Sequence, residues 1–540
     1  MRRKYSFKNL FLGALIGVGI ILNSYGFVQA KTPLEEAKYV IESCYVDKVS
    51  KDVINSSTIS DMVKKLNDPF SSYFTAEQYN DFLNSIDNKF VGIGIYLEVV
   101  DSGIKVTSVI DNSSAKEAGI LPGDIIISAD GHSLSKMVSE EATSYIKGKE
   151  GTSVNLVIDR NGEKISKTVY RKTVEIPTVK GEILDNEIGY INISSFGQDT
   201  ANLFTNVLED LNESNPKMYI IDLRFNGGGY MGAALDIAGH FIGKNPAIIV
   251  KNRNDEKQKI NAYNYKQIDK PVIFLINEYT ASASEILSAA VKDYNKAIFI
   301  GENSYGKGVA QQMFRLVDGS VLKITTQRFY SPLGNEIHKK GISPDVLVKE
   351  EYTDSLFVAR LLTYKENQAL NSNECEIGNY VIKINEDYYK IPISKVREKG
   401  LFKAFKSLVK GVDKSNVYVG TEKGFKNISE DIINNDLKLF YPDFAEGKRV
   451  SKNLKDNVIK VKFNRELDKS TVNNNSIFVV KDSNGKIEEA KINFINSKVI
   501  TLTLNKCINK GDKFYIVIDK KVKDLEGKCI KDKTALEVSY

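Results

Sequence analysis

Apolar runs alternate with amphipathic stretches between residues 175 and 349. Short runs rich in β-branched residues predict buried strands at 188–193, 219–221, 247–250, 272–276 and 297–301. Apolar residues spaced three and four apart predict helices around 203–211, 231–240 and 284–294. Strands and helices that alternate in this way predict an α/β core whose apolar strands are covered on both faces.

The segment before this core has a helical pattern up to about position 89. Thr32, Pro33 and Glu35 form an N-terminal capping signal, with proline at the first helical position. One apolar face follows, made of Leu34, Ala37, Val40 and Ile41. Further helices are predicted near 62–66 and over 75–82. We therefore expect a helical N-terminal region over residues 31–89.

Short strands and turns dominate two other parts of the chain. Residues 90–172 contain a tight turn at 118–124 and a hairpin signal at Asn161-Gly162. Residues 446–540 contain regularly spaced strands that predict a β-sandwich. Those strands are expected at 458–463, 477–480, 499–504 and 514–518. The intervening 350–445 alternates weakly and is interpreted as a linker and a small domain without an assigned function.

Residues 1–30 have the features of a targeting segment. Arg2, Arg3 and Lys4 precede an apolar core over 10–22, and small residues at 28–30 are typical of a cleavage site. The apolar run is short for a membrane span, yet an uncleaved anchor remains an alternative to a cleaved signal peptide. Both alternatives predict an extracytoplasmic protein, either anchored in the cell membrane or secreted.

The composition is that of a globular multidomain chain. The 540 residues are 42% hydrophobic and 27% charged, with a net charge of +6. This charge is compatible with an anionic membrane or cell-wall surface, and no basic stripe with interleaved aromatics predicts nucleic-acid binding. Three histidines and four cysteines match no zinc spacing, so neither a metal nor a cofactor is expected. Cys507 and Cys529 are the only pair for which a disulfide is considered.

The stretch from 280 to 311 carries the candidate chemistry. Ser282 and Glu285 have capping-box spacing after the predicted strand 272–276, so a helix with its N–H groups and positive dipole end should begin at the serine. Lys307, between two glycines, follows twenty-five residues later. A cap serine and a surface lysine turn are the plainer interpretations of each feature alone. A glycine-rich turn over 222–229 ends another strand and can direct N–H groups at a ligand.

Together, the segments 222–229, 280–286 and 306–311 resemble the signature blocks of the carboxyl-terminal processing peptidases, a serine–lysine protease family. The resemblance spans about 31–349 and implies an α/β (crotonase/ClpP-like) protease core over 173–349. It implies three catalytic residues: Ser282 as nucleophile, Lys307 as general base and Gln311 as the residue that orients the lysine. It also implies oxyanion N–H groups from Ala283 and from the glycine turn, at Gly227 or Gly228.

Histidine offers an alternative base. His132 and His240 lie far from these segments, and His240 is expected to be a packed or capping residue. His338 lies in a block that follows the lysine, so a Ser–His arrangement is a minor alternative.

Residues 90–172 resemble a PDZ domain. The resemblance assigns the capture of a peptide carboxylate to the loop of Val91, Gly92, Ile93, Gly94 and Ile95, followed by a strand that accepts the peptide as an added strand. The expected partners are polypeptide substrates with free C-termini. Segments in 446–540 resemble bacterial immunoglobulin-like repeats. The N-terminal helices resemble a region through which family members form homodimers, although simple packing on the core explains them equally well.

The sequence therefore predicts an exported serine endopeptidase that acts through an acyl-enzyme on chains selected by their C-terminal ends. Two alternatives belong to other classes. One is a catalytically inactive surface scaffold that binds peptides through its PDZ and sandwich domains. The other is a crotonase-like acyl-CoA enzyme, which would explain neither the PDZ module nor the export signal.

Overall fold

The computed structural model describes most of the chain from residue 32 to residue 539. The undescribed positions are 1–31, 264–267, 350–353, 367–369, 371–375, 377, 397, 399, 422, 435–437, 440, 441, 443, 444, 447–456, 482–486, 506–512, 532, 533 and 540. The predicted targeting segment and Cys507 of the considered disulfide lie outside the described residues. Among the helices described, none combines the length and the apolar character needed to cross a membrane.

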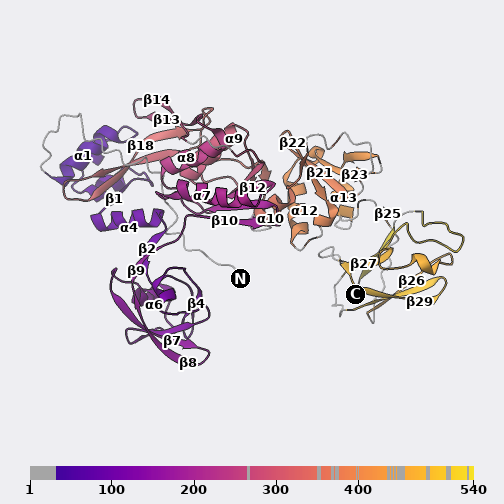
Figure 1. Cartoon of the computed structure of the whole chain (residues 1–540). Helices are drawn as coiled ribbons and strands as arrows, with labels where there is room; N and C mark the ends of the chain where they lie inside the picture. The colour runs from indigo at the N-terminus through magenta and orange to yellow at the C-terminus, as the bar shows by residue number, and fades with distance from the viewer. Residues whose placement is uncertain are drawn as a thin grey trace. The chain divides into compact units, whose positions relative to one another are not determined.

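The chain divides into two units, Met1–Ala297 with Asn303–Ser343, and Ile298–Glu302 with Pro344–Tyr540. The first contains the helical region, the PDZ domain and most of the protease core. The second contains the small domain and the C-terminal sandwich (Figure 1).

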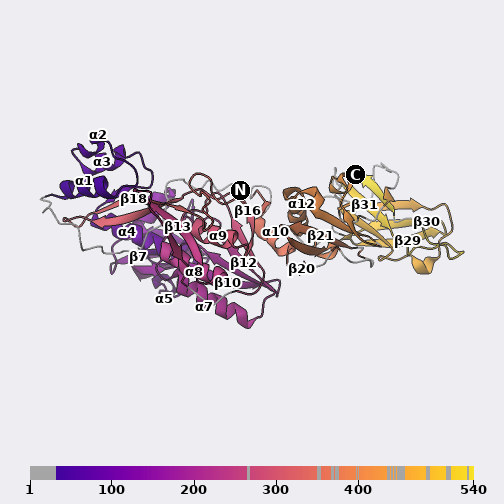
Figure 2. The same cartoon turned by 90° about the horizontal axis from the view of Figure 1, so that it is seen from above.

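The N-terminal helices pack on the core. They are α1 (Pro33–Cys44), α2 (Lys51–Ile54), α3 (Ile59–Lys65) and α4 (Ala76–Ile86), with β1 (Ser72–Phe74) between the last two. The Thr32 hydroxyl accepts a hydrogen bond from Glu35 N at 3.2 Å, which confirms the predicted start of α1. Ala37, Ile41 and Met62 share a buried cluster with Leu322 and Ile324 of the core, and α1–α3 lie beside β18 (Figure 2). The predicted homodimer stays a prediction.

The PDZ domain is a sheet closed over its own core. Its elements are β2 (Lys89–Gly92), β3 (Ile95–Val100), β4 (Gly103–Val109), α5 (Ser114–Glu117), β5 (Ile125–Ala129), β6 (His132–Ser133), α6 (Ser139–Ile146), β7 (Ser153–Arg160), β8 (Glu163–Tyr170) and β9 (Lys172–Glu175). The sheet order is β3-β4-β5-β7-β8, which leaves β3 at one edge. Asn161 and Gly162 have φ of 57° and 90°, so the predicted hairpin between β7 and β8 is confirmed.

Apolar strands form the centre of the protease core. Its first sheet joins β10 (Val179–Leu184), β11 (Ile188–Ile193), β12 (Met218–Asp222) and β15 (Val272–Ile276) in that order. The last three strands are parallel, and every residue of β12 and β15 is buried. The helices are α7 (Thr200–Glu213), α8 (Met231–Ile242) and α9 (Ala283–Asp293). The predicted bounds of β11 and β15 are confirmed to the residue.

A second sheet of the core holds the residues after the predicted lysine turn. It has the order β1-β18-β13-β14, and β17 also pairs with β18. Its strands are β13 (Pro246–Asn252), β14 (Lys257–Asn261), β17 (Val309–Arg315) and β18 (Val321–Tyr330), with β17 and β18 joined by a hairpin that contains Asp318 and Gly319. Strand β13 is antiparallel to its partners here and is no neighbour of β12 or β15, because pairing depends on contacts that a run of apolar residues does not specify.

The second unit is built from two further domains. Strands β16 (Ile298–Gly301) and β19 (Val346–Leu347) pair in parallel. The small domain has α10 (Ser355–Leu361), β20 (Lys365–Glu366), β21 (Asn379–Ile384), β22 (Asp387–Pro392), α11 (Ile393–Val396), α12 (Leu401–Gly411), β23 (Val417–Thr421), β24 (Gly424–Asn427) and α13 (Glu430–Ile433). Its sheet order is β20-β22-β21-β23-β24, so the segment interpreted as linker and small domain folds around a regular sheet.

The C-terminal domain is the predicted β-sandwich. One sheet has the order β25-β32-β31-β27-β28 and the other β26-β30-β29. The strands are β25 (Ala445–Glu446), β26 (Val458–Lys462), β27 (Ile477–Lys481), β28 (Ile487–Glu488), β29 (Ala490–Asn496), β30 (Val499–Leu504), β31 (Lys513–Ile518) and β32 (Thr534–Ser539). Side chains from both sheets, such as Ile500 and Ile516, share one buried cluster.

Candidate active site

Ser282 lies at the sharp junction between β15 and α9. Its side chain is fully buried, and its backbone has φ 62° and ψ −113°. A positive φ is costly for a residue with a Cβ, by roughly 1–3 kcal/mol, and is characteristic of functional sites. The turn before it is fixed by hydrogen bonds from Thr280 N to Asn277 O at 2.9 Å and from Ala281 N to Asn226 O at 3.0 Å. The strained serine is therefore held by the neighbouring loops.

Glu285 connects the serine to the lysine turn. Its Oε2 accepts hydrogen bonds from Ser282 N and Lys307 N, both at 2.8 Å, and its Oε1 accepts from Gly306 N at 2.7 Å and Ser304 Oγ at 2.6 Å. Burial raises the pKa of this carboxyl, while the four donors lower it. The capping-box prediction is confirmed, but the sequence did not indicate that the same side chain holds the lysine turn.

Lys307 is almost completely buried, with 3% of its surface exposed. Its Nζ donates to Gln311 Oε1 at 2.9 Å and lies 4.7 Å from the centre of the Phe70 ring. Burial holds the pKa of Lys307 well below its ordinary value, and the charge of Lys323 lowers it further. The negative charges of Asp68 and Glu285 oppose this shift. A lysine in these surroundings loses its proton more readily than a lysine in water.

Gln311 is fully buried and faces the next strand. Its Nε2 donates to Thr325 Oγ1 at 3.1 Å, and the two residues are register partners between β17 and β18. A register shift between Ala310 and Gln311 interrupts the ladder at this point.

The glycine turn after β12 approaches the serine closely. A Cβ on Gly228 would lie 2.8 Å from Ser282 Cβ and 2.9 Å from Ala283 N, and Gly228 has φ +103°. The N–H of Gly228 donates to Asn226 Oδ1 at 2.9 Å. Within the described part of the chain, the N–H groups of Gly227 and Ala283 donate to no backbone or side-chain acceptor. The N–H of Ala283, at the start of α9, and the N–H of Gly227, in the glycine turn, can therefore serve a ligand.

An ion pair and a carboxamide hold the glycine turn that follows β12. Arg224, which is partly buried, forms an ion pair with the buried Asp222, with Nη2 and Oδ2 2.6 Å apart. The Asn277 Oδ1 accepts hydrogen bonds from Phe225 N at 3.0 Å and Tyr279 N at 3.2 Å, so one carboxamide joins the glycine turn to the serine turn.

The histidines occupy other environments. His338 lies edge-on to Phe70 with ring centres 6.4 Å apart, and its buried Nδ1 has no hydrogen-bond partner among the described residues. Among the described residues, no carboxylate therefore bonds to Nδ1 of this imidazole, as a Ser–His arrangement would require. The expectation that His240 is packed is confirmed, because it is buried and pairs with the Thr205 hydroxyl at 3.0 Å.

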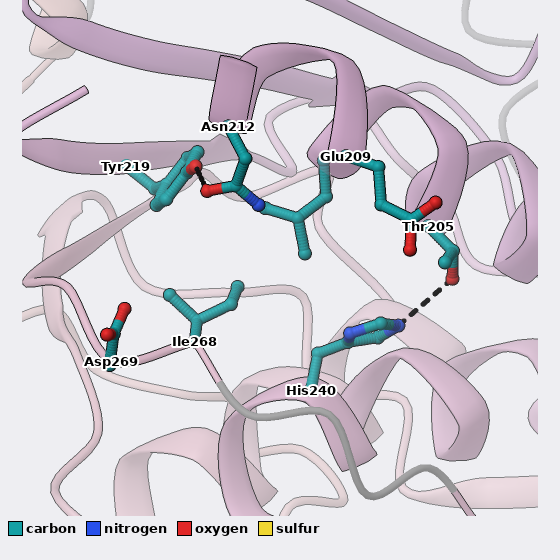
Figure 3. Close-up of a pocket in the computed structure, with 8 residues that line it drawn as sticks. Thr205, Glu209, Asn212, Tyr219, His240, Ile268 and Asp269 are labelled. Carbon is teal, nitrogen blue, oxygen red and sulfur yellow. Dashed lines mark hydrogen bonds between the residues drawn. The ribbon is translucent and has the colours of Figure 1, made fainter. Parts of the chain in front are cut away.

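His240 also lines a cavity of about 130 Å³ between α7 and α8 (Figure 3). The lining residues are Thr205, Leu208, Glu209, Asn212, Tyr219, His240, Ile268 and Asp269. None of the predicted site residues belongs to this lining.

The predicted carboxylate loop of the PDZ domain is divided between two elements. Val91 and Gly92 belong to β2, paired with β9, and Ile95 begins β3. The backbone carbonyls of Ile93 and Gly94 accept hydrogen bonds from Ala115 N and Ile110 N. Their role in peptide binding stays a prediction, while the edge position of β3 is suited to strand addition.

Sequence comparisons match each of the three recognised parts. Residues 187–348 match the model of Peptidase family S41, residues 91–170 a PDZ domain and residues 448–540 a bacterial Ig-like domain. The chain is 35% identical over 373 residues to the carboxy-terminal processing protease CtpA of Bacillus subtilis (strain 168), covering 68% of this chain and 80% of that protein. It is 35% identical over 356 residues to CtpB of the same organism, covering 65% and 73%.

Among solved structures, the photosystem II D1 C-terminal processing protease aligns with a TM-score of 0.41 at 23% identity, covering 63% of this chain and 98% of that one. The resemblance inferred from the segments around Asp222, Ser282 and Lys307 is confirmed by the relatives at 35% identity. The chain thus belongs to the carboxy-terminal processing serine proteases of peptidase family S41, and it carries a PDZ domain and a C-terminal Ig-like domain.

Proposed function

We propose that this peptidase hydrolyses peptide bonds with Ser282 as nucleophile and Lys307 as general base. The observation that carries the proposal is the buried Glu285 carboxylate, one oxygen of which holds the backbone of both residues. The burial of the lysine amine, and after it the positive charge of Lys323, favour the neutral form of Lys307, and the Gln311 carbonyl oxygen holds the amine in place.

In the proposed mechanism, neutral Lys307 Nζ accepts the proton of Ser282 Oγ as this oxygen attacks the carbonyl carbon of the scissile peptide. The N–H groups of Ala283 and Gly227 stabilise the oxyanion of the tetrahedral intermediate. Lys307 then transfers the proton to the leaving amine nitrogen, the C–N bond breaks, and an ester to Ser282 remains. Water, deprotonated by Lys307, attacks the ester, releases a new carboxyl end and restores the serine hydroxyl.

The substrate is proposed to be a polypeptide whose free C-terminus binds the PDZ domain. The Bacillus subtilis relatives are named as carboxy-terminal processing proteases, and this chain contains a PDZ domain. The C-terminus of the substrate would bind as an added strand at β3. This binding would raise the local concentration of substrate at Ser282, which by itself would select little between substrates.

The test compares Ser282→Ala and Lys307→Ala with the parent on an unfolded protein substrate. Both variants should lose activity by about 10³-fold or more, because the two groups act as a unit. Ser288→Ala is the matched control: this serine is buried in the same helix, and its hydroxyl has no hydrogen-bond partner among the described residues. Cleavage retained by either variant would reject the assignment, and an inactive parent would favour the peptide-binding scaffold.

We also propose that the protein is exported and acts outside the cytoplasm. The support is the basic start at 2–4 followed by the apolar run at 10–22. Fractionation of cells that express the full chain should recover it in the membrane or the medium, and the mass of its N-terminus distinguishes cleavage from anchoring. Recovery in the cytoplasm alone would contradict this proposal.

A further inference from the structure

The loop that joins α3 to β1 reaches the buried lysine from the N-terminal region. This loop consists of residues 66–71, and its Phe70 ring lies against Lys307 Nζ. Phe70 N donates to Asp68 Oδ1 at 3.0 Å, so the aspartate fixes the backbone that carries the ring. One wall of the lysine site therefore comes from a segment more than two hundred residues away in sequence.

A chain of hydrogen bonds connects the same aspartate to the lysine amine. Thr325 Oγ1 donates to Asp68 Oδ2 at 2.7 Å, Gln311 Nε2 donates to Thr325 Oγ1 at 3.1 Å, and Lys307 Nζ donates to Gln311 Oε1 at 2.9 Å. Ser71 Oγ also donates to Asp68 Oδ2 at 2.6 Å and accepts from Thr325 N at 3.2 Å. The loop and strand β18 are thus joined twice.

The direction of these hydrogen bonds follows from the carboxylate. An ionised aspartate only accepts hydrogen bonds, so the single proton of the Thr325 hydroxyl must point to Asp68. The hydroxyl oxygen can then only accept from Gln311, which turns the NH₂ of the amide toward Thr325 and its carbonyl oxygen toward Lys307. A carbonyl oxygen is the group that a lysine donor requires, whereas a reversed amide would present N–H groups to it.

We propose that Asp68 is a positioning residue for Lys307: through Thr325 it sets the orientation of the Gln311 amide, and through its loop it places Phe70 against the amine. The proposal rests on the proposed roles of Ser282 and Lys307. It makes the docked N-terminal region a part of the active site.

The charges around Lys307 also support a link between Asp68 and the lysine. The charged groups that face Lys307 are Lys323 from β18, Asp68 from the loop and Glu285 from α9. The negative charge of Asp68 raises the pKa of Lys307, and the positive charge of Lys323 lowers it. Removing one or the other charge should therefore shift the pKa of Lys307 in opposite directions.

The first experiment tests the hydrogen-bond chain by steady-state kinetics of the full chain on an unfolded protein substrate. Thr325→Val keeps the side-chain shape but removes both hydrogen bonds, so kcat should fall about 10- to 100-fold while KM stays within about twofold. Thr325→Ser retains a hydroxyl and should recover most of the activity. Thr326→Val is the matched control, since the Thr326 hydroxyl is buried on the same strand without a hydrogen-bond partner among the described residues.

The second experiment measures how kcat/KM depends on pH. Its acidic limb reports the deprotonation of Lys307 in the free enzyme. Asp68→Asn should move this limb to lower pH, and Lys323→Met should move it to higher pH. A purely structural role of the loop would lower activity in both variants without opposite shifts of the limb.

Wild-type kcat in Thr325→Val, or limbs that move in the same direction in Asp68→Asn and Lys323→Met, would overturn this inference. Both results are separable from failure of the proposed chemistry, because Ser282→Ala would still abolish cleavage. If Ser282→Ala itself remained active, the proposed function would be rejected, whatever the results for Asp68 and Thr325.

Discussion

Two buried lysines, Lys307 in the turn before β17 and Lys323 in β18, have different partners. Lys307 donates to the Gln311 amide, whereas Lys323 Nζ lies 4.8 Å from the centre of the Phe82 ring and 5.6 Å from that of Phe74. Burial lowers the pKa of Lys323 to about 8, with Asp68 opposing the shift. Lys307 is the general base of the proposed mechanism. Lys323 lowers the pKa of Lys307, and the burial of Lys323 itself costs stability.

Lys323→Met should stabilise the first unit at neutral pH. The unfolded chain keeps the lysine proton up to about pH 10.5, whereas the folded chain releases it at about 8, so the wild-type free energy of unfolding should rise between these values. The corresponding penalty at neutral pH is about 3 kcal/mol, which the methionine removes. Denaturant unfolding at pH 7 and pH 10 measures the difference. It should be largest at pH 7, and a difference independent of pH would contradict this account.

At the scale of elements, the site is the meeting point of three turns. The glycine turn after β12, the serine turn before α9 and the lysine turn before β17 are joined by Asn277 and Glu285. Each amide or carboxylate binds the backbone of two turns, so a displacement of one turn is transmitted to the next. The geometry around Ser282 thus depends on all three turns together.

Gly228→Ala should disturb the contact between the glycine turn and the serine turn directly. The new Cβ would lie 2.8 Å from both Ser282 Cβ and Ala281 O, and alanine is strained at φ +103°. We expect kcat/KM to fall about 100-fold and the free energy of unfolding to fall by roughly 1–3 kcal/mol. Gly232→Ala, in α8, is the control: no atom lies within 4 Å of its Cβ, and it should stabilise by roughly 0.5–1 kcal/mol. Equal effects of the two variants would contradict the role assigned to the glycine turn.

At the scale of the whole molecule, a peptidase domain is combined with a PDZ domain. The PDZ sheet leaves β3 at its edge, and its own core is separate from that of the protease sheets. Two folded modules on one chain allow the end of a substrate to be selected by one and an internal bond to be cut by the other. The Ig-like domain and the small domain belong to the second unit.

Amidation of a substrate's C-terminus should weaken the binding of that substrate to the intact enzyme. A carboxylate held by backbone N–H groups forms charge-assisted hydrogen bonds that an amide cannot replace, so KM should rise about tenfold or more with little change in kcat. Matched peptides with a free and an amidated C-terminus provide the measurement. Equal KM values would show that selection does not depend on the terminal charge.

Local patterns were sufficient for many elements and for the candidate residues. The bounds of β11 and β15, the cap at Thr32 and the hairpin at Asn161-Gly162 follow from periodicity and turn chemistry within a few residues. The signature segments likewise identified the family through residues close in sequence. The catalytic roles of Ser282 and Lys307 stay predictions until they are tested by mutation.

Contacts between distant segments were decided only by the tertiary structure. No local signal shows that β1 pairs with β18, that β13 leaves the parallel strands, or that Asp68 is bonded to Thr325. A three-residue strand has too little periodicity to be recognised, and an Asp-Pro pair resembles an ordinary turn. The sequence by itself determined which residues could carry the chemistry. Folding decided which distant side chains surround them, because burial and hydrogen bonding arise from neighbours in space.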